Sequence, residues 1–250
     1  MTGKYTIAMA RRVLEVVDAG LVEGLGTAEP GKLCVEAAIC YALGLPHGDD
    51  PGCVEPAVRS FKIALNDKRW SSAAARAKGL RALAVAQLGS KGVIDGRAFA
   101  KRLAEQTIRQ IVPIALRAAA RRNPRSADRL EAAAIRCEQE GTREAVSIGR
   151  DAAYAAAADD AYAAAAAAAY AAYAAAADDA AAADDAAAAD DAAAADAAAA
   201  DAAADAAADA AADAARRDGI LALMAEIGLR VLRDMNAPGV ALWDAVNADA

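Results

Sequence analysis

The chain has 250 residues, with 28 Lys and Arg against 35 Asp and Glu and a formal net charge of −7. This length allows one or two domains. Alanine inflates the hydrophobic share of 57%, because the 63 residues from Asp151 to Asp213 are 45 Ala, 14 Asp and 4 Tyr. The rest of the chain is long enough for one core, and the composition excludes collagen, coiled coils and disulfide-rich scaffolds.

The predicted elements are helices, whose ends are marked by glycine, proline and capping residues. Apolar residues at helical spacing predict a first helix from Tyr5 to Asp18, which stops before Gly20. A second helix is predicted from Lys32 to Leu43, and Gly44 ends it. Pro30 suits the first turn of this second helix.

A loop with two prolines and two glycines comes next, at 45–52, a composition typical of turns. The sequence then predicts a helix over 55–65, with a proline in its first turn. Ser71 or Ser72 caps the next helix, which Gly89 ends.

Three further helix starts are predicted in the middle of the chain. Asp95 caps a helix that reaches the region of Pro113, where the proline either kinks or ends it. Ser126 starts a short helix, and Thr142 caps the next one.

From Thr142 to Asp218 the chain has one glycine and no proline. Alanine is the best helix former, so this stretch is predicted to be one long helix or a helical hairpin. An amphipathic helix comes after it, and no two-residue alternation indicates a strand. The predicted fold is all-α, with a basic helical body over 1–141, the alanine- and aspartate-rich segment over 142–218, and a C-terminal helix and anchor over 219–250 that packs on the body.

Charge is divided unevenly along the chain. Residues 1–150 have 24 Lys and Arg against 16 Asp and Glu, a net +8, whereas residues 151–250 have 4 against 19, a net −15. Either the acidic segment lies against the basic body of the same or a neighbouring chain, or each part binds an outside partner of opposite charge. One interpretation of the alanine tract is a solvated helical arm or hairpin. The alternatives are self-association through its alanine faces and mimicry of a nucleic acid through its rows of aspartate.

No membrane span is expected, because aspartate interrupts the alanine tract every few residues and a span needs roughly 20 apolar residues. The opening sequence MTGKYTIAMARR lacks the apolar segment of a signal peptide. With four cysteines and no export signal, we expect a cytoplasmic protein with reduced thiols.

Cys34, Cys40, His47 and Cys53 are a conceivable zinc site. They are separated by five, six and five residues, whereas structural zinc sites usually have about two to four. We therefore predict buried core cysteines and no bound metal. His47 is the single histidine, so an enzyme would have to use it with Cys53 or Asp49, and we expect no enzymatic activity.

Cations, an aromatic ring and a helix start come together between residues 62 and 78. A helix start offers free N–H groups and a positive dipole end to an anion, while tryptophan stacks on bases and arginine pairs with phosphate. The alternative is a capped helix with a solvated basic face and Trp70 in the core. The residues predicted to bind a nucleotide-like small anion are Lys62, Asn66, Asp67, Arg69, Trp70, Ser71, Ser72, Arg76 and His47.

The runs CVEAAICYALGLPHGDDPGCV (34–54), KIALND (62–67) and ARAKGLRALAVAQLGS (75–90) resemble a group of proteins from phages and proteobacteria. The ending MNAPGVALWDAV (235–246) and the Ala/Tyr/Asp-rich tail resemble that group as well. Similar tails occur in bacterial immunity proteins. The resemblance implies a role in host–phage conflict and assigns no residue to a site.

These observations together predict a non-enzymatic binding protein of the anti-defence or immunity kind. It would sequester or neutralise a target such as a small nucleotide signal. The alternative is a scaffold that oligomerises, or a mimic of a nucleic acid, through the acidic helix. We expect a homo-oligomer with a protein or small-anion partner and no cofactor.

Overall fold

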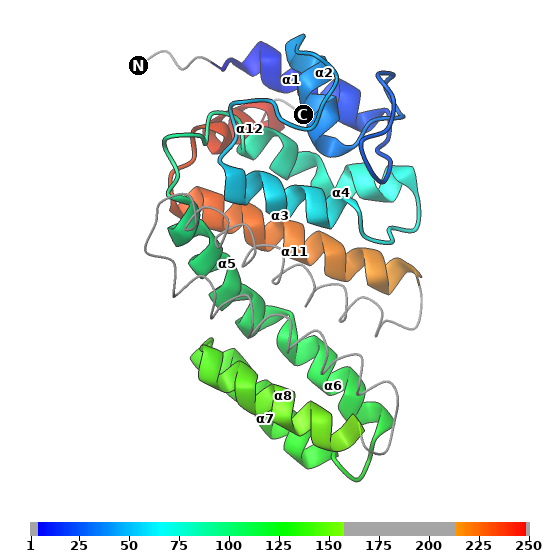
Figure 1. Cartoon of the computed structure of the whole chain (residues 1–250), viewed down its shortest axis with the longest axis vertical. Helices are drawn as coiled ribbons and strands as arrows, with labels where there is room; N and C mark the ends of the chain where they lie inside the picture. Colours follow the sequence, from blue (N-terminus) through cyan, green and yellow to red (C-terminus); the bar gives the residue numbers. More distant parts are fainter. Residues whose placement is uncertain (1–4, 158–213, 249–250) are drawn as a thin grey trace. The chain divides into compact units, whose positions relative to one another are not determined.

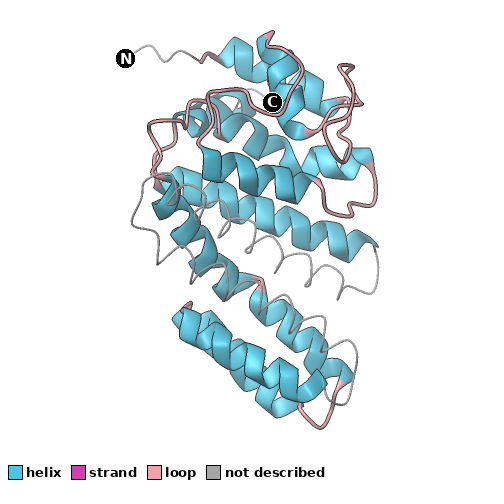
Figure 2. Ribbon diagram, in the orientation of Figure 1, coloured by secondary structure: helices cyan, strands magenta, loops and turns pink. Residues whose placement is uncertain are grey.

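A computed structural model describes residues 5–157 and 214–248, and over these ranges the fold is all-α (Figure 1). No β-strand forms within these ranges, where the residues outside helices are loops and turns (Figure 2). The helices are α1 (Ile7–Asp18), α2 (Val35–Leu43), α3 (Pro56–Asn66), α4 (Ala73–Ala86), α5 (Gly96–Gln110), α6 (Val112–Arg122), α7 (Ala127–Glu140), α8 (Arg143–Ala157), α11 (Ala214–Asp234) and α12 (Pro238–Ala248).

Several of the predicted helix ends are confirmed by hydrogen bonds. The side chains of Ser72, Asp95 and Thr142 accept from the backbone N–H groups three residues later, at 3.1, 2.8 and 3.2 Å. These bonds satisfy N–H groups that have no partner inside the helix. Gly44 ends α2 with a φ of 71°, a left-handed conformation that glycine adopts without strain.

The start of α2 differs from the prediction, and one residue interrupts the helix before Pro113. α2 begins at Val35 rather than Lys32, and its cap is Cys34, whose sulfur accepts from the N–H of Ala37 at 3.3 Å. The preceding residues cannot be helical because Leu33 forms isolated β-bridges with Leu21 and Gly26. Near Pro113, α5 stops at Gln110 and α6 starts at Val112, and Ile111 between them keeps right-handed helical dihedral angles.

The chain divides into two compact units, Met1–Phe99 with Leu221–Ala250, and Ala100–Ile220. The division therefore falls inside the predicted body over 1–141. In the first unit, α1 packs on α2, α4 and α12, and α12 also packs on α4. The C-terminal helices thus complete the core that the N-terminal helices begin.

The second unit contains the helices α6, α7 and α8, with α7 packed on both neighbours. Its buried core includes Leu116, Leu130, Cys137 and Val146. The guanidinium of Arg109, near the end of α5, donates to the last carbonyls of α7 at 2.6–3.0 Å. This contact satisfies carbonyl groups that the end of a helix leaves without partners.

The predicted long helix or hairpin over 142–218 falls largely outside the described residues, since only its first part in α8 and its last part in α11 are included. Across the described ranges, no helix has the length and apolar character needed to cross a membrane.

Candidate functional site

Asn66 and Asp67, at the end of α3, hold the loop that precedes α2. The Asn66 amide oxygen accepts from the N–H of Val35 at 3.1 Å, and its nitrogen donates to the carbonyl of Val22 at 2.9 Å. The Asp67 carboxylate accepts from the N–H of Gly24 at 2.9 Å. Both side chains predicted to bind a ligand therefore hold the protein's own backbone.

Arg76 is nine-tenths buried, with 8% of its surface exposed. Its guanidinium donates to the carbonyls of Asn66, Leu21 and Lys68 at 2.7, 3.1 and 3.3 Å. The guanidinium therefore joins the end of α3 to Leu21, in the loop that precedes α2. It is not free to pair with a phosphate.

Trp70 lies in the core, which agrees with the alternative prediction of a capped helix with a buried tryptophan. Its indole N–H donates to the carbonyl of Leu65 at 3.0 Å. The six-membered part of its ring packs directly against Gly79, where any larger residue would collide with it. The ring is therefore covered by its own helices and does not offer a face to a base.

The other predicted ligand residues, Arg69, Ser71, Ser72 and His47, are exposed. Ser72 is used as the α4 cap, and the Nε2 atom of His47 lies 3.3 Å from the carbonyl of Gly26. Ligand binding by this group stays a prediction. The structure does not gather its members around one open surface.

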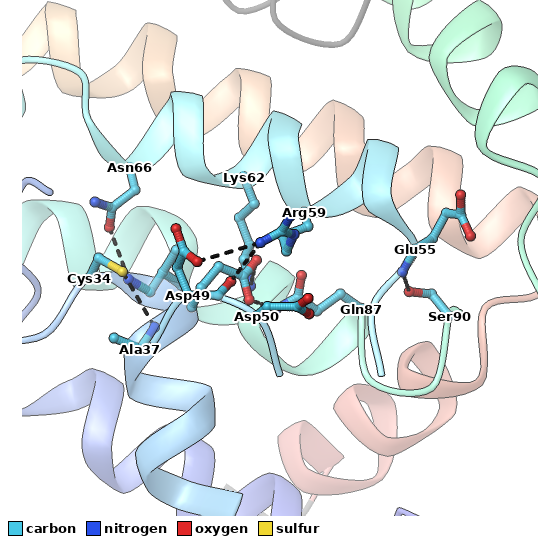
Figure 3. A network of polar contacts seen from close by, with 12 residues as sticks. Cys34, Ala37, Asp49, Asp50, Glu55, Arg59, Lys62, Asn66, Gln87 and Ser90 are labelled. Carbon is cyan, nitrogen blue, oxygen red and sulfur yellow. Dashed lines mark hydrogen bonds and ion pairs between the residues drawn. The ribbon is translucent and has the colours of Figure 1, made fainter. Parts of the chain in front are cut away.

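Lys62 belongs to a buried ion pair that connects three helices. Its Nζ atom lies 3.1 Å from Oε1 of Glu36, and the two side chains are 1% and 0% exposed. The amide nitrogen of Gln87 donates to Oε2 of Glu36 at 3.1 Å. Figure 3 shows Lys62 reaching from α3, and Gln87 reaching from the end of α4, toward the same place.

Burial dominates the electrostatics of this pair. It raises the pKa of Glu36 and lowers the pKa of Lys62, while the attraction between the two charges opposes both shifts. Glu36 and Gln87 were missed in the sequence. Glu36 lies inside an otherwise apolar helix and Gln87 directly follows the apolar end of α4, and polar residues at such places predict a buried partner elsewhere in the fold.

The cysteines are buried and free, as predicted. Burial raises the pKa of Cys40 to about 11 and that of Cys137 to about 12, so both thiols are protonated at neutral pH. The side chain of Cys53 is hydrogen-bonded to Tyr5. The pKa of Tyr5 is raised to about 12, mainly by burial and then by this hydrogen bond. No three His, Cys, Asp or Glu side chains of the described ranges are grouped as metal ligands.

The second unit has an exposed basic surface at the turn between α6 and α7, which we call the arginine turn (Arg121, Arg125 and Arg129). The buried Asn123 fixes this turn, since its amide nitrogen donates to the carbonyl of Ala156 at 3.1 Å and its oxygen accepts from the N–H of Ser126 at 3.2 Å. None of the three arginines has an ion-pair partner among the residues described.

Arg117, in the neighbouring helix α6, differs from the arginine turn because it is paired with carboxylates. Its guanidinium binds the carboxylates of both Glu131, at 2.9 Å, and Glu138. The charge of Arg117 is thereby neutralised within the unit, whereas the arginine turn has no such carboxylate partner among the described residues.

Comparison with known proteins finds no matching family model, no matching curated protein and no matching solved structure.

Proposed function

We propose that the protein is a non-enzymatic binding protein that holds an anionic partner on the arginine turn. The observation that carries this proposal is the set of three exposed arginines without carboxylate partners in the described ranges, on a turn fixed by Asn123. Arginine presents several N–H groups in a plane and pairs with carboxylates and phosphates in two-point contacts. Three such groups in nine residues favour a partner with several negative charges.

The chemistry of the first unit supports a binding role. Its thiols are buried, that of Cys40 is protonated, and its central lysine is already paired with Glu36. The resemblance to phage and immunity proteins supports a role in host–phage conflict, in which the bound partner is sequestered or neutralised. A small nucleotide signal stays within this proposal as one kind of anion.

Heparin chromatography tests the arginine turn with a polyanion as the probe. The whole chain has a net charge of −7, so retention at about 50 mM salt requires a local basic surface. We expect the wild type to be retained, and the double variant Arg121→Glu with Arg125→Glu to pass through. The matched control, Lys78→Glu with Lys91→Glu, makes the same change in net charge on exposed positions of the first unit and should elute like the wild type.

Equal loss of retention in the two double variants would show that net charge alone determines retention on heparin, and this result would contradict the proposal. A wild type that is not retained would contradict it as well.

A second candidate is a scaffold that associates through its acidic segment, or a nucleic-acid mimic. The composition favours it, since residues 158–213 contain 13 Asp and no Lys or Arg. Light scattering over a range of protein and salt concentrations tests the scaffold. We expect oligomers that dissociate as salt screens the charges, and a monomer under all conditions would rule out the scaffold.

A further inference from the structure

A hollow of about 390 Å³ lies between α7 and α8 in the second unit. Its walls come from one face of each helix, because the lining positions recur at three- and four-residue spacing. The lining residues are Arg129, Ala132, Ala133 and Arg136 of α7, and Ile148, Asp151 and Ala152 of α8. Pockets for small molecules usually have volumes of about 300–1,000 Å³ and apolar walls with a few polar groups.

The hollow exists because alanines of α7 and α8 lie between longer side chains, those of Arg129, Arg136 and Ile148. Ala133 and Ala152 are 3% and 4% exposed and form the base. α7 and α8 are in close contact beside the hollow, since the thiol of Cys137 donates to the carbonyl of Ala145 at 3.5 Å, and Gly149 of α8 lies against Leu116 of α6. The rest of the lining is Ala132, Ile148, Asp151 and the two arginines.

Among the described residues, the charges around the hollow leave one cation without an ion-pair partner. Asp151 pairs with Arg150 at 3.1 Å, and Arg136 pairs with Glu140 at 2.8 Å. Arg129 is exposed and has no ion-pair partner in the ranges that the structure describes. The lining of the hollow therefore includes one guanidinium that no carboxylate of the described ranges neutralises.

We propose that this hollow binds a small organic anion with an apolar body. The carboxylate, sulfonate or phosphate of the ligand pairs with Arg129, and its apolar part lies on the alanines and Ile148. This inference shares Arg129 with the proposed function and goes beyond it by assigning an apolar binding site that includes residues of α8, which are not part of the arginine turn.

The test uses anilinonaphthalene sulfonate, a sulfonate on an aromatic body that fluoresces when it leaves water. Titration of the full chain should show saturable binding of one molecule. Arg129→Gln should weaken this binding about tenfold by removing the charged hydrogen bonds. Ala132→Leu should weaken it at least as much, because the larger side chain occupies the hollow from an exposed position.

Arg102→Gln is the matched control, since it removes the same charge from an exposed site of α5 that belongs neither to the hollow nor to the arginine turn, and its affinity should equal that of the wild type. Thermal unfolding checks that each variant is folded. The proposal is overturned if the wild type shows no saturable binding, if Arg102→Gln and Arg129→Gln weaken it equally, or if Ala132→Leu has no effect. Ala132→Leu should still be retained on heparin, which separates this result from the test of the arginine turn.

Discussion

Replacing Lys62 with methionine is expected to lower the free energy of unfolding by about 3–5 kcal/mol. Methionine is similar in length to the lysine stem, but it leaves the carboxylate of Glu36 without its cation. That carboxylate is 0% exposed, so water cannot replace the lost partner. Urea denaturation at pH 7, followed by circular dichroism, measures the change.

A second variant separates the unpaired charge from the loss of packing. Adding Glu36→Gln to Lys62→Met removes the buried charge and keeps an oxygen that accepts from Gln87. The double variant should therefore recover more than half of the lost stability.

An exposed ion pair of the first unit serves as the control for the buried pair of Lys62 and Glu36. Arg233 and Asp244 form an ion pair at 2.6 Å with side chains 45% and 49% exposed, and Arg233→Met should cost less than about 1 kcal/mol. If Lys62→Met costs no more than Arg233→Met, the pair with Glu36 does not stabilise the first unit through its charges.

Helix ends were predictable because their chemistry is local. A serine or aspartate caps N–H groups only two or three residues away, so Ser72 and Asp95 could be identified without knowledge of the fold. Gly44 was identifiable for the same reason, since its conformation depends on the backbone beside it. α2 was predicted to start too early, because the bridges that hold Leu33 involve a different segment of chain.

The roles of the charged residues were not predictable in this way. Lys62 and Lys78 look equivalent in the sequence, yet one is buried beside Glu36 and the other is exposed. Likewise Arg117 is paired, whereas Arg121 has no ion-pair partner in the described ranges. Whether a lysine or arginine has an ion-pair partner depends on side chains from other helices. The residues next to it in the sequence do not show where those side chains lie.

Replacing Gly228 with alanine is expected to lower the free energy of unfolding by about 2 kcal/mol, although alanine is the better helix former. A Cβ atom there would lie 2.5 Å from Cε1 of Phe61 and 3.4 Å from a methyl group of Leu83. The Phe61 ring is fully buried and its centroid is 6.0 Å from that of Phe99. The ring therefore has little room to move, and α11 must shift away from α3 and α4.

Gly219→Ala in the same helix is the matched control. The site is exposed, and a Cβ atom there would meet nothing within 4 Å. Only the helix propensity then changes, so this variant should gain up to about 1 kcal/mol. A loss in the free energy of unfolding at Gly228 together with a gain at Gly219 would confirm that α11 packs closely on Phe61. A gain at both positions would mean that the core tolerates the added methyl group and that α11 and Phe61 are not in close contact.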